Sequence, residues 1–109
     1  MIYEHRKYVS LPGKQAALFA RFESAVLQLF EKHGMDVVGF WQPITGQTMN
    51  ELHYILRWKD LAQMERSWKL FFADSTWERA VAESEADGPI LVGSEVELWR
   101  TAPFYRDTH

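Results

Sequence analysis

Residues 35–59, with the sequence MDVVGFWQPITGQTMNELHYILRWK, contain two predicted strands joined by a short loop. The second strand, Glu51–Lys59, alternates in character, so that one face carries its leucines, a tyrosine and a tryptophan. The first strand lies within Met35–Ile44 and is closed by Pro43 and Gly46. About six residues separate the two strands, which favours an antiparallel hairpin.

Upstream of the hairpin, the sequence predicts a strand followed by a helix. Ile2–Ser10 combines aromatic and β-branched residues with polar groups on both faces, and it ends before Pro12 and Gly13. Lys14–Gly34 repeats apolar residues at intervals of three and four, the pattern of an amphipathic helix, with Arg21 assigned to the polar side. The apolar side of this helix consists of Leu18, Phe19, Phe22, Ala25, Val26, Leu29 and Phe30.

Downstream of the hairpin, a second helical region and a final strand are expected. Asp60 is a good N-cap for a helix that runs through Phe72, and Asp74 or Ser75 is suited to cap a continuation of it. Ile90–Thr101 is the last predicted strand, with alternating apolar side chains on one face. The chain therefore has the element order β-α-β-β-α-β.

This order is that of a ferredoxin-like fold. We expect one α+β domain over residues 1–109, with a four-stranded antiparallel sheet and the helices on one face. The tail, residues 102–109, includes Phe104 and Tyr105, which indicates that part of it packs onto the domain.

The other face of the sheet is left open by this topology. Several aromatic and aliphatic side chains are expected there, and an apolar face of that size is rarely left in water. We therefore expect a second copy to pack against it, related by a two-fold axis, to form a dimeric α+β barrel. The side chains expected on the open face are Tyr3, His5, Val9, Phe40, Ile55 and Trp99.

Composition excludes several classes of function. The net charge of −3 argues against nucleic-acid binding, which needs a basic surface. The chain has no cysteine, which excludes disulfides, thiolate metal sites and cysteine nucleophiles. No apolar run is long enough for a signal peptide or a membrane span, so we expect a cytoplasmic protein without membrane contact.

Three side chains at spacing two form the first candidate site. Glu4, Arg6 and Tyr8 project from one face of the first strand. If the helices cover that face, the charges must be paired, with Arg6 bound either to Glu4 or to Glu95. A structural ion pair that fixes the strand register is the alternative interpretation.

A cleft around these residues suits a small, flat ligand, aromatic or carboxylated. Tyr54 and Trp58 are expected to line it beside Arg6 and Tyr8. Asn50, the only asparagine, has a position suited either to a turn or to the mouth of the pocket. The candidate ligand-binding residues are Glu4, Arg6, Tyr8, Trp41, Asn50, Tyr54, Trp58 and Glu95.

No metal or cofactor is expected from the histidines. His5 and His53 lie on the opposite strand faces from the first cluster, and His33 is placed to cap a helix. The sequence has no H-x-H, H-x-x-x-H or E-x-x-H spacing, which argues against a metal site. The second helix carries no histidine to ligate a haem.

Taken in order, several segments resemble the NIPSNAP family. The matching segments are Tyr3-Glu4-x-Arg6-x-Tyr8, Pro12-Gly13-Lys14, His33-Gly34, Val37-Val38-Gly39-Phe40-Trp41, Met49-Asn50-Glu51-Leu52, Trp58-x-Asp60-Leu61, Asp74-x-x-Trp77, Glu95 and Ala102-Pro103-Phe104. The resemblance implies a ferredoxin-like subunit that dimerises into an α+β barrel, in a family whose biochemical activity is poorly defined. One departure stands out, because Tyr54 and Leu56 occupy the positions where the family pattern has His and Trp.

Two functions remain open at this level. The first is a small-molecule-binding homodimer, which as a cofactor-free enzyme would use Arg6 to stabilise an oxyanion and Tyr8 or Tyr54 to donate a proton. The second is a non-catalytic interaction or adaptor module, as the animal members of the family suggest. A sizeable cavity near Arg6 would favour the first, and a filled interior with an exposed aromatic patch would favour the second.

Overall fold

The computed structural model describes residues 1–107; the last two residues of the predicted tail lie outside this range. Four strands form the sheet: β1 (Ile2–Ser10), β2 (Asp36–Trp41), β3 (Glu51–Trp58) and β4 (Leu91–Trp99). The helical elements are α1 (Gln15–Arg21), a π-helical turn η1 (Phe22–Val26), α2 (Leu27–Lys32), α3 (Leu61–Ala73) and α4 (Ser75–Ser84).

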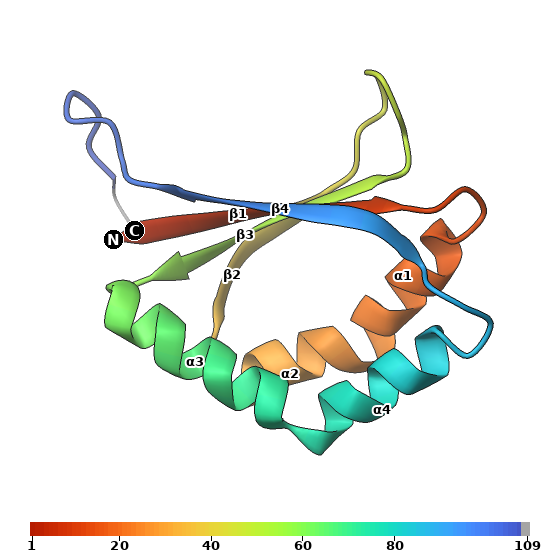
Figure 1. The fold of residues 1–109 in the computed structure, drawn as a ribbon. Helices are drawn as coiled ribbons and strands as arrows, with labels where there is room; N and C mark the ends of the chain where they lie inside the picture. Colours follow the sequence, from red (N-terminus) through yellow and green to blue (C-terminus); the bar gives the residue numbers. More distant parts are fainter. Residues whose placement is uncertain (108–109) are drawn as a thin grey trace.

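The four strands form one antiparallel sheet in the order β2-β3-β1-β4. All helices lie on one side of it, and the other side is open (Figure 1). The predicted α+β architecture of the subunit is therefore confirmed. No helix within residues 1–107 is both long and apolar enough to cross a bilayer.

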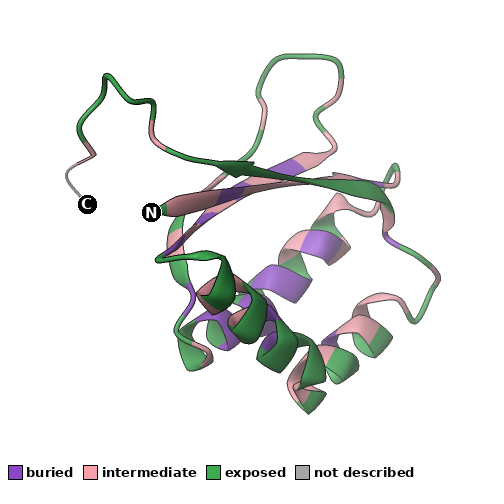
Figure 2. Ribbon diagram, turned by 60° about the vertical axis from the view of Figure 1, so that its left-hand side comes forward, coloured by how far each residue is buried: buried purple, intermediate pink, exposed green. Residues whose placement is uncertain are grey.

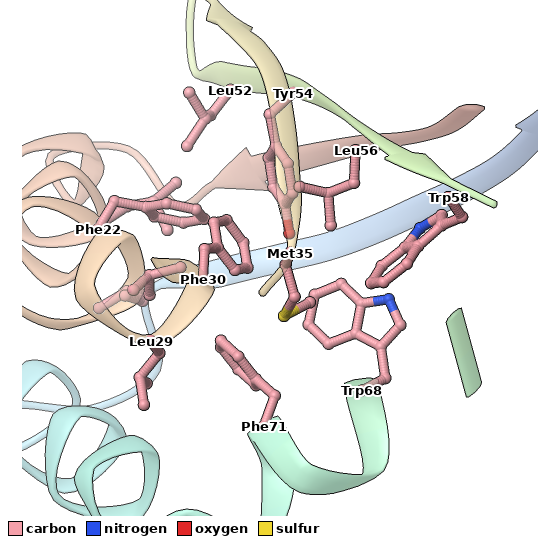
Figure 3. Packing of buried hydrophobic residues seen from close by; sticks show 13 residues of the cluster. Phe22, Leu29, Phe30, Met35, Leu52, Tyr54, Leu56, Trp58, Trp68 and Phe71 are labelled. Atoms are coloured by element: carbon pink, nitrogen blue, oxygen red, sulfur yellow. The ribbon is translucent and has the colours of Figure 1, made fainter. Parts of the chain in front are cut away.

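Burial along β3 fixes which sheet face meets the helices. Its residues alternate strictly, with Leu52, Tyr54, Leu56 and Trp58 buried and their neighbours only partly covered. Figure 2 shows the same contrast across the molecule, with buried positions on the helix surfaces that face the sheet and an exposed β4. The core between sheet and helices is largely aromatic and aliphatic, and Tyr54, Phe30, Trp58 and Trp68 meet in it (Figure 3).

A β-bulge in β2 corrects two of the sequence assignments. Val37 pairs with Leu56, but Gly39 pairs with the next residue of β3, so Val38 is an extra residue in this strand. A bulge reverses the face of every later side chain. Phe40, expected on the open face, therefore packs in the core, and Trp41, expected in the cleft, moves to the opposite face of the strand.

The first helix also differs from its predicted form. Gln15–Lys32 is interrupted by the π-helical turn η1, a feature that often occurs at functional sites. Arg21, assigned to the polar side, is buried, with only 6% of its surface exposed. The reason is its position, three residues after Leu18 and four before Ala25, which places it on the core side of the helix.

Both predicted caps of the second helical region are confirmed. The Asp60 side chain accepts from the backbone N–H of Gln63, and the Asp74 side chain accepts from that of Thr76. Asp74 also binds Lys32 at 2.7 Å and His33 at 3.0 Å. Hydrogen bonds from Lys32, Thr76 and His33 hold the pKa of Asp74 far below its usual range. This carboxylate therefore links α2 to the start of α4.

The C-terminal tail is held by a different residue from those expected. The tyrosine hydroxyl of Tyr3 donates to Asp107, which also accepts from Thr101, so the tail returns to β1. Phe104 is 93% exposed and Tyr105 is largely exposed. The tail thus contacts the domain through a polar group, and its two aromatic rings do not pack onto the domain.

Candidate functional site

A buried carboxylate is the centre of the polar cluster on the helix side of β1. Glu4 is 1% exposed and lies among aromatic residues of β3 and α3. Its Oε1 accepts from the indole Nε1 atoms of Trp58 and Trp68, both at 2.8 Å. Its Oε2 accepts from Arg6 Nε at 2.7 Å. Both oxygens are therefore engaged, and the predicted pairing of Arg6 with Glu4 is the one that forms.

Arg6 extends this cluster toward two tyrosines. Its guanidinium lies 4.1 Å from the Trp68 ring centroid, and its Nη1 donates to the Tyr8 hydroxyl at 3.3 Å. Burial alone would lower the pKa of Arg6, but the oxygens of Tyr54, Tyr8 and Glu4 outweigh it and raise that pKa. The guanidinium is therefore a permanent charge within the core.

Tyr8 and Tyr54 end the chain of hydrogen bonds. Their hydroxyl oxygens lie 3.0 Å apart, and either one is able to donate to the other. Burial, reinforced by the neighbouring Tyr8, raises the pKa of Tyr54 well above its ordinary value. Tyr54 is therefore a neutral phenol near pH 7.

One hydroxyl hydrogen of this pair has no acceptor among residues 1–107. The two phenols hold two hydrogens, and their mutual bond uses only one. Both tyrosines line an enclosed cavity of about 40 Å³, whose other walls are mostly aromatic. The spare hydroxyl hydrogen is thus available to an acceptor in this cavity. The cavity is lined by Tyr8, Arg21, Phe22, Val26, Tyr54, Trp68, Phe71, Phe72 and Trp77.

Arg21 is the cavity residue that sequence analysis missed. Its Nη1 lies 3.3 Å from Ser84 Oγ and 3.6 Å from Glu85 Oε2, at the end of α4. Its Nε is buried without a hydrogen-bond partner in the described part of the chain. Burial lowers the pKa of Arg21 from its ordinary value, although a guanidinium stays protonated in proteins. The signal that could have found it was its place within the apolar stripe of the helix.

A larger groove lies on the outer side of Phe22. It has a volume of about 350 Å³, is mostly apolar, and runs between the first helix and the edge of the sheet. Phe22 is the one residue that lines both this groove and the enclosed cavity. It is also the first residue of the π-helical turn. The groove is lined by Phe19, Phe22, Glu23, Leu27, Phe40, Trp41, Gln42 and Leu52.

The structure brings together five of the eight predicted site residues and separates the other three. Glu4, Arg6, Tyr8, Tyr54 and Trp58 form the chain described above. Trp41 instead lines the outer groove. Glu95 projects from the open face, where it pairs with Lys7 and not with Arg6. Asn50 joins β3 to β1 through its backbone carbonyl, which accepts from Ser10.

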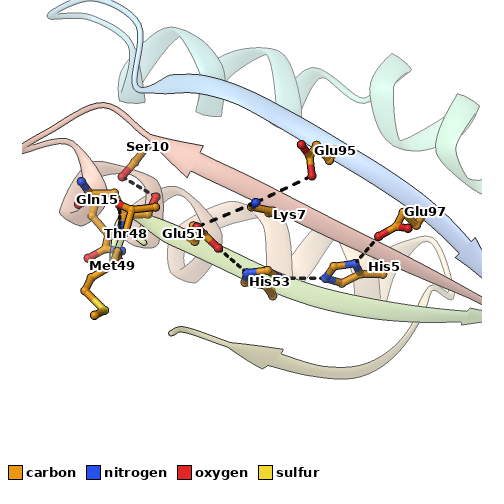
Figure 4. Close-up of polar contacts among 11 residues, drawn as sticks. His5, Lys7, Ser10, Gln15, Thr48, Met49, Glu51, His53, Glu95 and Glu97 are labelled. Atoms are coloured by element: carbon orange, nitrogen blue, oxygen red, sulfur yellow. Dashed lines mark hydrogen bonds and ion pairs between the residues drawn. The ribbon is translucent and has the colours of Figure 1, made fainter. Parts of the chain in front are cut away.

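The open face of the sheet carries a second polar network (Figure 4). His5 Nε2 and His53 Nδ1 lie 2.9 Å apart, and His53 Nε2 lies 2.8 Å from Glu51. Lys7 bridges Glu51 and Glu95 at about 4 Å. This face is thus more polar than the sequence suggested, although Trp99 stacks on His5. Residues 1–107 contain no group of three or more metal-ligating side chains.

Comparison with known protein families identifies the family of this chain. The model of the NIPSNAP family matches residues 3–106. The chain belongs to the NIPSNAP family. No curated protein sequence matches it.

Solved structures of NIPSNAP proteins have the same fold. An uncharacterized NIPSNAP domain protein from Burkholderia xenovorans is 20% identical over 98% of this chain and 100% of its own, with a TM-score of 0.83. Protein Atu4242 from Agrobacterium tumefaciens is 22% identical over 95% of this chain and 96% of its own, with a TM-score of 0.82. An antibiotic biosynthesis monooxygenase is more distant, at 15% identity over 94% and 100% of the two chains and a TM-score of 0.60. These similarities concern the fold alone.

Proposed function

We propose that this NIPSNAP protein is a cytoplasmic homodimer that binds a small carboxylated or aromatic ligand between its sheet and its helices. One observation carries the proposal: the chain from Arg6 through Tyr8 to Tyr54 ends at a cavity with an unused hydroxyl hydrogen. Buried polar groups without partners are rare in folded proteins, and their presence at a cavity is a reason to look for a ligand.

The two ends of this polar chain have different properties. At the Glu4 end, every carboxylate oxygen has a donor, as expected of a purely structural ion pair. At the tyrosine end, the hydrogen bonds stop beside empty space. A structural role accounts for the first end. Ligand binding accounts for the second, where a neutral Tyr54 is a hydrogen-bond donor.

The space available supports a ligand with a small polar end and an apolar body. The enclosed cavity of about 40 Å³ accommodates only a small group, and its spare hydroxyl hydrogen favours a polar one. The outer groove, at about 350 Å³, lies at the lower end of the roughly 300–1,000 Å³ range of ligand pockets. Phe22 is the one side chain common to the walls of both spaces, and the proposal requires its ring to move aside.

Exposed apolar side chains support the homodimer. One group of them lies on β4 and the tail, where Val96, Leu98 and Trp99 are each more than 40% exposed and Phe104 is almost fully exposed. Val96 and Leu98 pair with Arg6 and Glu4, so they lie on the helix side of the sheet, and Trp99 lies on the open side. We place the dimer contact on the open face and across β4, because a second copy there would cover these residues.

Native mass spectrometry of the protein purified from its host tests both parts. We expect a species near twice the protomer mass of 12.8 kDa, carrying additional mass from the ligand. The additional mass should be lost in Tyr54→Phe and retained in Tyr105→Phe, which alters an exposed tail tyrosine. A dimer without additional mass would contradict ligand binding, and a monomer would contradict the homodimer.

A second candidate, a non-catalytic interaction module, is favoured by the nearly filled interior. Only about 40 Å³ remains beside the tyrosines, whereas the walls of the outer groove include the exposed apolar residues Leu27 and Trp41. In that case the groove would receive an apolar segment of a partner protein. A ligand-free dimer in the mass spectrum would support this candidate over the first.

A further inference from the structure

We propose that the enclosed cavity is the seat of a carboxylate, held by the Arg21 guanidinium together with the spare hydroxyl of the Tyr8–Tyr54 pair. The inference rests on the proposed function, which it deepens by naming the charge of the ligand and the residue that binds it. Arg21 lies outside the Glu4 cluster, and it reaches the cavity from the first helix.

The environment of Arg21 leaves part of a charged group unsatisfied. Its guanidinium carbon lies 5.3 Å from the Trp77 ring centroid, a contact that stabilises the flat face of the group. The bonds to Ser84 and Glu85 use Nη1. Nothing among residues 1–107 accepts from Nε, although only 4% of the side chain is exposed. An unpaired donor on a buried cation is unfavourable unless a ligand or a water completes it.

The balance of charge around the cavity selects an anion. Glu4 and Arg6 form a neutral pair, and Glu4 has no free oxygen to receive a further donor. Arg21 is opposed only by Glu85, at 3.6 Å on the side of α4 and partly exposed. The cavity is therefore lined by an unused hydroxyl donor and by Arg21, the one charged side chain among its walls. A carboxylate matches both, because its oxygens only accept and its charge is opposite.

The size of the cavity sets the size of the anion. About 40 Å³ is room for roughly two or three water-sized groups, which corresponds to a carboxylate rather than a larger anion. The rest of the ligand must lie elsewhere, and two grooves share a wall residue with the cavity. The groove that shares Arg21 also carries Glu83 and Asp87, which repel an anion, so we assign the body of the ligand to the apolar groove that shares Phe22. The ligand class is therefore a small aromatic or aliphatic carboxylate, with its body in the groove.

Titration of the ¹⁵N-labelled protein with benzoate, and separately with its neutral analogue benzamide, tests the charge requirement. Trp68 and Trp77 line the cavity, so their indole N–H signals in NMR spectra report its occupation. Trp99, on the open face of β4, is the internal control. We expect benzoate to shift the two cavity signals saturably, with a Kd in roughly the millimolar range, and benzamide to bind at least about tenfold more weakly.

Arg21→Met tests the residue, with Arg79→Met as the matched control. Arg79 is an exposed arginine of the neighbouring helix α4. Glu85, the ion-pair partner of Arg21, is partly exposed and stays hydrated when the positive charge is removed, so we expect Arg21→Met to fold with a Tm close to that of the wild type. It should nevertheless lose benzoate affinity at least about tenfold, whereas Arg79→Met should change it less than about twofold. Tyr54→Phe should also weaken binding, and it is the alternative variant if Arg21→Met does not fold.

The outcomes separate this inference from the proposed function. Equal binding of benzamide and benzoate at the cavity signals would overturn the anion inference and leave a ligand site. Unchanged benzoate affinity in both Arg21→Met and Tyr54→Phe would overturn the assigned residues. No shift of the cavity signals by either compound, up to about 50 mM, would contradict the inference and the proposed function together.

Discussion

Strand β1 supplies alternate residues to the two faces of the sheet, and the two sets differ mainly in what covers them. On the helix side, Glu4 and Arg6 are bound to each other and to tryptophans within the core. On the open side, Lys7 and His5 pair with glutamates of β3 and β4 that are partly or largely exposed. Strand β1 therefore carries charged side chains in two environments, one buried behind the helices and one open to solvent.

The comparison of the two faces shows where an unpaired hydrogen-bond donor indicates a ligand. On the open face, water is available to any group that the protein leaves unpaired, so a spare donor has little meaning. Behind the helices, each unpaired group loses its hydration without replacement. The spare hydroxyl at Tyr8 and Tyr54 and the free Nε of Arg21 are therefore the features that point to a ligand. The open-face network is sufficiently explained by solvent-exposed pairing.

The largest expected effect is that of removing Glu4. Glu4→Ala leaves Arg6 unpaired and two indole N–H groups without an acceptor, so we expect a loss of about 3–5 kcal/mol in the free energy of unfolding. Glu97→Ala, on the adjacent strand of the open face, should lose less than about 1 kcal/mol. Urea unfolding measures both.

Glu4→Gln provides an intermediate variant if Glu4→Ala is too unstable to study. Its amide oxygen is still able to accept from the tryptophans, but it no longer neutralises Arg6. Similar small losses in the free energy of unfolding for the variants at positions 4 and 97 would contradict the difference between the two faces. Burial would then not determine how much a charged side chain contributes to stability.

Alkaline pH provides the next test, through Tyr54. Its pKa is raised in the folded state, so the unfolded chain releases this proton first as the pH increases. The stability that this group contributes is fully present below about pH 10 and is lost above it, by up to about 1.4 kcal/mol per pH unit. Tyr54→Phe should remove this part of the pH dependence, and Tyr105→Phe, in the exposed tail, should leave it unchanged. Parallel curves for the wild type and Tyr54→Phe, from urea midpoints at increasing pH, would contradict the assignment.

The smallest expected difference between the two faces is in how the loss of stability depends on salt concentration. Lys7 reaches Glu51 and Glu95 at about 4 Å on the open face, so Lys7→Met should lose less than about 1 kcal/mol, and the loss should disappear near 1 M NaCl. Arg6→Met isolates Glu4 in the core and should lose about 3 kcal/mol at both low and high salt. A loss for Lys7→Met that persists at high salt would show that the open-face pair is shielded from solvent.

Regular patterns in the sequence were sufficient for the main elements of the fold. Strict alternation in Glu51–Trp58 and the capping residues Asp60 and Asp74 each have a local cause, and the structure contains each of them. The site residues of β1 and β3 followed from the same alternation, because residues two apart share a face. These features depend on neighbours in the chain, which a single sequence displays.

The errors arose where pairing between distant segments decides the outcome. The extra residue Val38 is defined only by the register of β2 against β3, and it reversed Phe40 and Trp41 together. Arg21 was assigned to the surface by its charge, although its position in the helix is that of a core residue. Glu95 faces Lys7 because β4 pairs with β1 in a register that was not predictable from β4 alone.

The most direct test of a ligand site behind Phe22 is a crystal structure of the protein with 4-bromobenzoate, using anomalous scattering to locate the bromine. We expect the bromine in the groove beside Phe40 and Leu52, and the carboxylate within hydrogen-bond distance of the Arg21 guanidinium and a hydroxyl of the tyrosine pair. A cavity that contains only ordered water, with no bromine in the groove at a saturating concentration, would contradict the account.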